Sequence, residues 1–302
     1  MDSGIMHETK THGKLAFPYI VYHGNIPEYL RTYPLHWHDE MEIIYVVKGQ
    51  GLVTMQASKY ALQTGDMIVL LPQIVHSIEQ LDNAEMEYFN ILFQFSLLDS
   101  GVNDYCYQKY FKPFYEHTKT VPPYLPAGDP LNRLLLPYIC DLIQNRKQSY
   151  NGYELMVKSA LFAIMHYLDL NSTQTSGVER SLQTTYEKLK QLLSYIQANY
   201  ANPISITQAA AICGFSESHF MKLFKDLTGN TFTQYLKNFR LEAAAAQLAE
   251  GSQKVIEVSE NVGFHNHSYF TRSFTARYGL SPLEYKKSVL PAINNPHHSG
   301  LE

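Results

Sequence analysis

Cysteine is scarce in this sequence, and its spacing argues against a disulfide framework. The three cysteines, Cys106, Cys140 and Cys213, lie far apart and form no CxxC pair. An odd, sparse set of this kind is not typical of a disulfide-based secreted protein. We therefore expect free thiols in a reducing compartment.

Long apolar runs are also missing. The best one, from Met67 to Pro72, has the length of a strand, whereas a membrane-spanning helix needs about 20 apolar residues. The first residues, MDSGIMHETKTHGK, contain no apolar core of the kind that a signal peptide has. These absences predict a cytoplasmic protein without a membrane partner.

Charge is modest and unevenly placed. The net charge of −4 argues against a chain that binds nucleic acid over its whole surface. Residues 181–290, however, contain 11 Lys and Arg against 8 Asp and Glu, while the remainder contains 13 against 20. A mildly basic C-terminal part is typical of a local DNA-binding surface, although a solvated charge pattern gives the same balance.

The N-terminal part has the pattern of a small β-barrel or sandwich. Short runs rich in β-branched and aromatic residues at 43–47, 51–55, 67–71 and 88–95 predict strands, with turns at 48–51, 64–66 and 82–83. Two apolar helical stripes follow, at 131–147 and 153–170. This hairpin would either cap the barrel or pair with a second copy of the chain, and both interpretations stay open.

The strongest feature is an internal repeat. Residues 204–235 and 254–285 share one order of features: an apolar helix, Gly-Phe, a polar stretch, Phe-x-x-x-Phe, a glycine and a late tyrosine. The matching positions are Gly214-Phe215 with Gly263-Phe264, Phe220/Phe224 with Phe270/Phe274, Gly229 with Gly279, and Tyr235 with Tyr285.

Each copy has the layout of a helix-turn-helix. The first helix, 207–213 or 256–262, ends at Gly214 or Gly263, where a left-handed backbone costs little. The second helix begins near Ser216 or Asn266, both good N-cap residues. Its phenylalanines face inward, which leaves a polar face sized for a DNA major groove.

A helix over 231–248 joins the two copies and opens with a candidate capping box of Thr231 and Gln234. Its length of about 27 Å is close to the roughly 34 Å of one DNA turn. Ser281 and Glu284 form a matching capping box in the second copy. One chain is therefore predicted to hold two reading helices near successive grooves.

Through these residues the sequence resembles the AraC/XylS family of bacterial transcription regulators. The resemblance covers residues 186–287, through Gly214-Phe215, Arg240-Leu241, Gly263-Phe264 and Gly279-Leu280-Ser281-Pro282 with Tyr285. It implies that both units enter adjacent major grooves, that the chain dimerises through its N-terminal part, and that it activates RNA polymerase. Ser259 departs from the family, which usually has alanine there; a small polar residue should be tolerated.

Carried over by position, the resemblance implies a set of DNA-facing residues. Arg272 is the candidate for reading a base, because its guanidinium matches guanine O6 and N7. Lys222 and Lys225 are candidates for phosphate contacts, and an ordinary solvated helix face is the alternative for each single residue. The set is Ser218, His219, Met221, Lys222 and Lys225 in the first unit and His267, Ser268, Thr271 and Arg272 in the second.

Residues 36–49, HWHDEMEIIYVVKG, match the first motif of cupin barrels. Period 2 on an extended chain sends His36, His38 and Glu42 to the same side. Residues 65–80 resemble a degraded second motif that contains His76. Three imidazoles and a carboxylate form a ligand set for a divalent transition metal. The match is partial, because motif positions are replaced by Leu30, Leu71, Gln73 and Gln80.

Three roles for this cluster stay open: hydrogen bonds that fix the barrel mouth, a metal site, or polar contacts to an effector. Many regulators with an AraC-type DNA domain carry such a sensor, which binds a small molecule, commonly a sugar. We take effector binding as the prediction and expect no metal or other cofactor. The predicted effector residues are Arg31, Tyr33, His36, His38, Glu42, His76 and Tyr88.

The sequence thus predicts an α+β multidomain chain: a cupin-like barrel (1–128), a helical hairpin (129–171), a linker (172–185), an all-α tandem helix-turn-helix domain (186–288) and a tail (289–302). The predicted function is a sequence-specific transcription activator that binds double-stranded DNA as a homodimer and responds to a small molecule, with a sugar as the candidate. The alternative is a metal-dependent cupin enzyme with a helical appendage. That alternative accounts for the histidines but not for the repeat, so we expect no catalytic residues.

Overall fold

The computed structural model describes residues 6–8, 12–27, 32–56, 58–101, 103–148, 150–228 and 230–293. The chain divides into two compact units, of which the first runs to residue 187 and the second begins at residue 188. Arg31, Gly229 and residues 294–302 of the expected tail lie outside the described residues.

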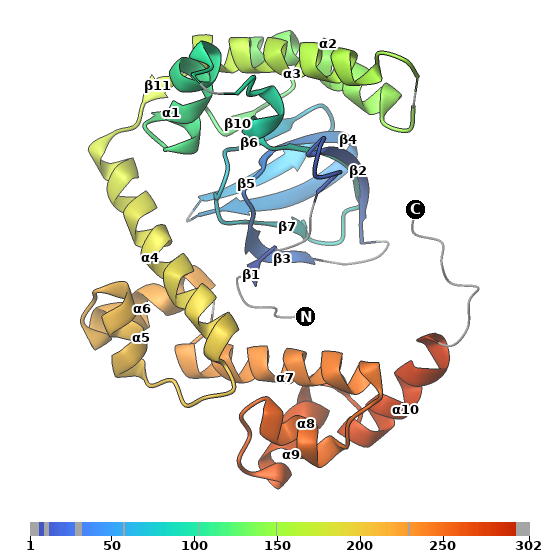
Figure 1. Cartoon of the computed structure of the whole chain (residues 1–302), viewed down its shortest axis with the longest axis vertical. Coiled ribbons are helices and arrows are strands. Elements are labelled where there is room, and N and C mark those ends of the chain that lie inside the picture. Colours follow the sequence, from blue (N-terminus) through green and yellow to red (C-terminus); the bar gives the residue numbers. More distant parts are fainter. Residues whose placement is uncertain are drawn as a thin grey trace. The chain divides into compact units, whose positions relative to one another are not determined.

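The first unit is built on two sheets that share one long strand, β4 (Met41–Met55) (Figure 1). One sheet has the order β2-β8-β4-β6-β10 and the other β1-β3-β7-β4-β5. Among the described residues no strand pair closes the two sheets, so they form an open-sided barrel. The remaining bounds are β1 Met6–His7, β2 Tyr19–Ile26, β3 Thr32–Trp37, β5 Ser58–Gln63, β6 Met67–Leu70, β7 His76–Gln80, β8 Met86–Phe93 and β10 Tyr124–Leu125.

Strand β4 corrects one expectation, because residues 43–47 and 51–55 are one strand and residues 48–51 are not a turn. β4 pairs with β8 up to Gly49 and with β5 and β7 from Gln50 or Gly51 onward. Gly49 has φ of 85°, and a Cβ there would lie 1.9 Å from the carbonyl oxygen of Glu85. The glycine therefore bends the strand from one sheet into the other without interrupting it.

The alternation along β4 decides which side chains enter the space between the sheets. Met41 and Ile43 face the helices, whereas Glu42, Ile44 and Val46 take the opposite side. Since both faces of this sheet are covered, the first part of the strand, residues 41–47, is mostly apolar. Glu42 is the one charged residue in that part, and it is 2% exposed.

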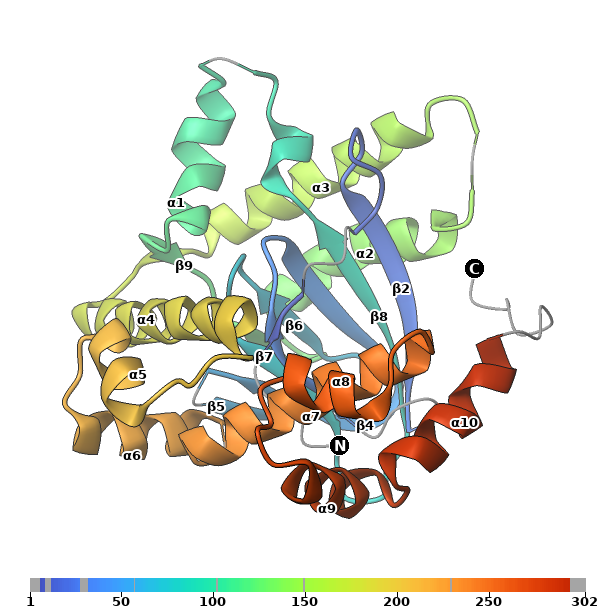
Figure 2. The ribbon, with the colours of Figure 1, turned by 60° about the horizontal axis from the view of Figure 1, so that its bottom comes forward.

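Two long helices cover the outer face of the sheet that contains β2 and β8. Helices α2 (Pro130–Asn145) and α3 (Tyr153–Leu170) lie side by side over it (Figures 1 and 2). Asp129 caps α2 by accepting hydrogen bonds from the backbone of the first turn, and Pro130 suits that position. A 3₁₀ turn (Phe95–Leu98), a π-helical turn (Tyr107–Phe111) and α1 (Lys112–Tyr115) complete this layer.

The segment expected to be a linker, 172–185, is ordered in the structure. Strand β11 (Thr173–Gln174) pairs with β9 (Lys119–Thr120), and α4 (Gly177–Asn199) begins a few residues later. The apolar spacing of Tyr186, Leu189 and Leu193 continues upstream to Leu182, so the helical pattern starts earlier than the polar composition suggested.

The second unit is helical. After α4 come α5 (Ile206–Cys213), α6 (Glu217–Thr228), α7 (Phe232–Glu250), α8 (Val255–Asn261), α9 (His267–Tyr278) and α10 (Pro282–Ile293). Its second half packs Leu241 and Leu248 of α7 against Val258 of α8 and the paired phenylalanines of α9. Across the described residues, no helix combines the length and the apolar content that crossing a lipid bilayer requires.

Candidate functional site

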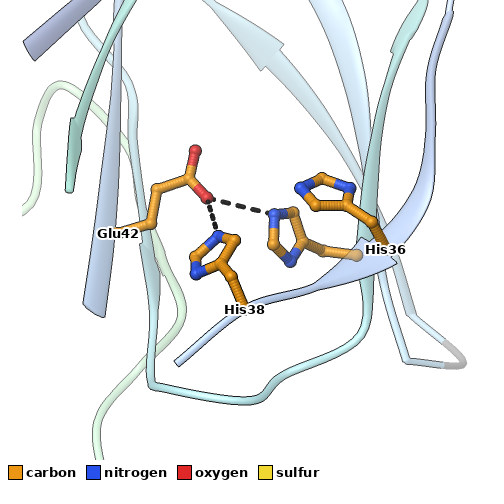
Figure 3. Close-up of side chains that lie close together, drawn as sticks. His36, His38 and Glu42 are labelled. Carbon is orange, nitrogen blue, oxygen red and sulfur yellow. Dashed lines mark hydrogen bonds and ion pairs between the residues drawn. The ribbon is translucent and has the colours of Figure 1, made fainter. Parts of the chain in front are cut away.

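Four side chains that the sequence singled out meet between the two sheets. The potential ligand atoms of His36, His38, Glu42 and His76 all lie within 4.8 Å of one another, and each residue is buried. Strand β3 and the turn after it bring in the first two histidines, β4 the glutamate and β7 the third histidine. Figure 3 shows Glu42 and His38 pointing toward each other beside His36.

One carboxylate oxygen is the centre of the cluster. Glu42 Oε2 lies 2.9 Å from His38 Nε2 and 3.0 Å from His76 Nε2. The opposite ring nitrogens of both histidines lie close to backbone carbonyls: His38 Nδ1 is 3.2 Å from Glu40 O and His76 Nδ1 is 2.8 Å from Ile74 O. Since a carbonyl oxygen can only accept a hydrogen bond, both Nδ1 atoms carry the hydrogen and donate it. In the neutral tautomer, both Nε2 atoms would then turn a lone pair toward Glu42.

A proton on His38 Nε2, or a metal ion shared by the cluster, relieves the resulting repulsion between lone pairs and carboxylate. Burial by itself would lower the pKa of His38, but the hydrogen bond and charge of Glu42 outweigh it and raise that pKa. Burial would raise the pKa of Glu42, yet the hydrogen bonds from His38 and His76 hold it well below its ordinary range. Histidines fixed through Nδ1 to carbonyls are also typical metal ligands.

The N-terminal segment extends this cluster with residues that the sequence analysis missed. Glu8 accepts a hydrogen bond from the Tyr33 hydroxyl at 2.9 Å and lies 3.6 Å from both His12 Nε2 and His36 Nε2. Burial opposes ionisation of Glu8, but these histidines and Tyr33 lower its pKa to about 2. No local pattern marks these residues in the sequence, because β1 reaches the site only by pairing with β3.

A cavity of about 200 Å³ opens onto the cluster. Of the predicted effector residues, Tyr33, His36, His38, Glu42 and Tyr88 line it. His76 contacts Glu42 instead, and Arg31 lies outside the described residues. Its further lining residues are Glu8, His12, Tyr22, His23, Gly24, Ile78, Asn90 and Leu92.

The second unit contains the two predicted helix-turn-helix corners. Gly214 ends α5 with φ of 64°, and Gly263 follows α8 with φ of 85°. A Cβ on Gly263 would lie 2.4 Å from the carbonyl oxygen of Ala201, so that corner also needs glycine for space. Asn266 caps α9 by accepting from the Tyr269 backbone. Phe264 is buried at its corner, while Phe215 is only half-buried and packs on His219.

The capping boxes differ between the two copies. Ser281 and Glu284 form both reciprocal bonds, at 3.3 and 2.8 Å. Thr231 accepts from the Gln234 backbone at 3.3 Å, but the Gln234 side chain donates to Asn238. The box at α7 is therefore only half formed.

The helices proposed to read DNA bury one face and expose the other. Phe220, Phe224, Phe270 and Phe274 are each at most 1% exposed. Thr271 is half-buried. The other predicted DNA-facing residues are exposed: Ser218, His219, Met221, Lys222, Lys225, His267, Ser268 and Arg272.

Two polar residues position these helices. Arg240 of α7 donates to the carbonyls of Tyr200 and Asn202, at 2.7 and 2.8 Å, so this residue of the family pattern ties α7 to the loop before α5. Ser259, the departure from the family, is buried on α8 and lies 3.4 Å from Nδ1 of His267 at the start of α9.

Comparison with known proteins follows the same division of the chain. Residues 17–165 match the family of the AraC-like ligand binding domain, and residues 200–288 match a helix-turn-helix domain family. Uncharacterized HTH-type transcriptional regulator YdeC of Bacillus subtilis is 25% identical over 283 residues, which cover 93% of this chain and 95% of that protein. YfiF of the same organism, also named an HTH-type transcriptional regulator, is 26% identical over 293 residues, covering 92% and 88%.

A further relative carries a more specific name. The HTH-type transcriptional activator RhaS of Mannheimia succiniciproducens is 23% identical over 254 residues, which cover 84% of this chain and 89% of that protein. All three alignments therefore extend through most of both chains.

Proposed function

This chain belongs to the AraC family of transcriptional regulators, and we propose that it binds DNA through both helix-turn-helix units at once, in response to a small molecule held in its first unit. The observation that carries the proposal is the pair of exposed polar helix faces, on α6 and α9, connected through α7. α7 has 19 residues, so its length of about 28 Å suits reading helices in successive major grooves.

Selection from random oligonucleotides, followed by footprinting with the full chain, tests this part. We expect two protected major-groove segments about one helical turn apart for each bound chain. A single protected segment would refute joint binding by the two units, and no protection at any ionic strength would refute the DNA-binding role.

The effector is proposed to bind in the 200 Å³ cavity beside the histidine cluster. Tyr33, Tyr88 and Asn90 offer hydroxyl and amide groups there, and Glu8 and Glu42 offer carboxylates. Such groups pair with sugar hydroxyls. A thermal-shift series with aldopentoses and aldohexoses tests whether this cavity binds a sugar. A rise in melting temperature that Tyr88→Phe reduces supports the site. If no sugar changes the melting temperature, a sugar is excluded as the effector.

A metal ion is the second candidate for this site, and the fixed Nδ1 atoms of His38 and His76 favour it. With both Nδ1 atoms facing carbonyls, two Nε2 lone pairs and Glu42 Oε2 converge. His36 would supply a further imidazole. Titration with Zn²⁺ and Co²⁺ tests whether the cluster binds a metal ion, with metal content and Co²⁺ absorption as the measurements. Stoichiometric metal that His76→Gln abolishes supports the site, and substoichiometric metal in both proteins excludes it.

The remaining parts of the proposal concern assembly and location. We propose a cytoplasmic homodimer formed through α2 and α3, whose outer faces expose Leu134, Leu155 and Phe162. We also propose that the protein activates transcription by contacting RNA polymerase, as the name of the relative RhaS as an activator suggests, and that it has no catalytic activity. Analytical ultracentrifugation and a reporter assay in a deletion strain test the dimer and the activation.

A further inference from the structure

A second and larger cavity lies in the first unit, where α4 begins. Its volume is about 450 Å³, more than twice that of the cavity beside the histidine cluster. Its walls come from the sheet edge, from the segment around β9, from the segment around β11, and from the second turn of α4. Its lining includes Gln56, Tyr60, Lys119, Thr175, Leu182 and Gln183.

Two polar atoms in this wall are buried without a partner. Thr175 is 7% exposed and Gln183 is 8% exposed. Gln183 Oε1 accepts from Gln56 Nε2 at 3.1 Å. Within the described residues, however, neither Gln183 Nε2 nor Thr175 Oγ1 has a hydrogen-bond partner. Because leaving such an atom unpaired costs about 1–3 kcal/mol, the cavity favours a molecule that pairs with both.

The charges around the cavity restrict that molecule. Lys119 carries the one ammonium group of the described lining, and its Nζ is 2.5 Å from Asp169 Oδ1. The described lining contains no aspartate or glutamate. An ionised ligand would therefore lose water without gaining an unpaired countercharge, which is unfavourable. The occupant should be uncharged.

The rest of the lining fits a ligand with one apolar face. Tyr60 and Leu182 supply an aromatic ring and aliphatic surface in addition to the amide and hydroxyl groups. Sugars combine C–H faces with hydroxyl groups in this way. The volume lies within the range of about 300–1,000 Å³ that is typical of small-molecule sites.

We propose that this cavity is a second ligand site, separate from the histidine cluster, which takes an uncharged polyhydroxylated molecule up to the size of a disaccharide. Thr175 Oγ1 and Gln183 Nε2 are its polar anchors. Since Gln183 belongs to α4 and Gln56 follows β4, an occupant bonded to Gln183 also ties the start of α4 to the sheet. The ligand thus orders the segment through which the chain enters its second unit.

Calorimetric titration of the full chain with maltose, sucrose and trehalose tests the proposal, with gluconate as the charged comparison. We expect at least one disaccharide to bind and gluconate not to bind. Hydrogen exchange should show new protection in residues 117–123 and 171–187, and none in residues 33–42. Protection confined to residues 33–42, or no binding by any of the three disaccharides, overturns the proposal.

Variants separate a binding role from a packing role. Thr175→Val keeps the volume and removes the unpaired hydroxyl, so it should weaken binding about tenfold and also raise the melting temperature of the sugar-free protein. Gln183→Leu should weaken binding similarly. Thr184→Val is the matched control, because Thr184 is exposed and donates to the carbonyl of Arg180 within α4. Equal affinity in all three variants would overturn the assignment.

Discussion

Glu42 Oε2 lies 2.9 Å from Nε2 of His38, whose other ring nitrogen faces the carbonyl of Glu40. Both side chains are almost completely buried. The pair is therefore stable while His38 carries a proton or binds a metal, and it loses that stability when the imidazole is neutral and bare. Protons and metal ions compete for the same nitrogen, which makes the cluster's stability depend on pH in opposite ways with and without metal.

The first prediction concerns pH in the presence of a chelator. The pKa of Glu42 lies below its ordinary value of 4.5, so its contribution is complete above that value and is lost as the pH falls. The pKa of His38 lies above 6.5, so its contribution is complete below 6.5 and is lost as the pH rises through the raised pKa. Calorimetry of the first unit should therefore give the highest Tm between about pH 4.5 and 6.5.

Excess Zn²⁺ should reverse the fall of Tm above about pH 6.5. Metal binding requires deprotonated imidazoles, so the bound protein should become more stable as the pH rises. Glu42→Gln should destabilise the first unit by about 1–3 kcal/mol. It should also make the Tm of the metal-free protein depend less on pH on the alkaline side. Glu87→Gln is the matched control, since Glu87 makes a 2.8 Å contact with His23 on the surface, where an ion pair contributes little. A chelated protein whose Tm rises steadily from pH 6 to 8 would contradict this account.

The sequence could identify part of this site because the information is local. His36, His38 and Glu42 share one side of an extended segment by strand periodicity alone. Glu8 and His12 could not be predicted, because they reach the cluster only through the pairing of β1 with β3. The continuity of β4 could not be predicted from the sequence either, because glycine at position 49 is typical of a turn. Only the position of Gly49 opposite Glu85 shows that the strand continues.

The second prediction compares two glycines of the second unit. Gly263→Ala should destabilise that unit by roughly 2–4 kcal/mol, because it adds left-handed strain and also a clash with the Ala201 carbonyl. Gly279→Ala has a similar positive φ of 72° but open space around the new methyl group. It should cost about 1 kcal/mol. Urea denaturation followed by far-ultraviolet circular dichroism measures both, and equal losses would show that the Ala201 contact is unimportant.

The helix-turn-helix half was predicted more completely, since its rules act within a few residues. The Gly-Phe corners, the caps at Asn266 and Ser281 and the buried phenylalanine pairs all follow from local spacing. The anchoring by Arg240 could not be predicted, because its acceptors are some 40 residues away in sequence. Its charge marks it equally well as a candidate DNA contact.

The third prediction separates base reading from phosphate binding. Arg272→Ala should weaken operator binding by about 1–3 kcal/mol and relax the preference at one base pair. Lys225→Ala should weaken binding to all sequences similarly and lower the slope of affinity against salt by about 1. Fluorescence anisotropy over a set of single-base operator variants at several salt concentrations distinguishes them. An unchanged base preference in Arg272→Ala would remove that residue from the reading set.

The last prediction concerns the surface proposed for dimerisation. Leu155 on α3 is 74% exposed, and Leu134 and Phe162 on the same hairpin are 44% and 40% exposed. Burying a leucine between two chains contributes about 1.5–3 kcal/mol on each side, and a buried glutamate there would cost more than that. Leu155→Glu should therefore raise the dimer dissociation constant at least a hundredfold. Leu15→Glu is the matched control, because Leu15 is 95% exposed and lies outside the hairpin. Sedimentation equilibrium of both variants measures the effect, and a dimer that survives Leu155→Glu as well as Leu15→Glu would place the interface elsewhere.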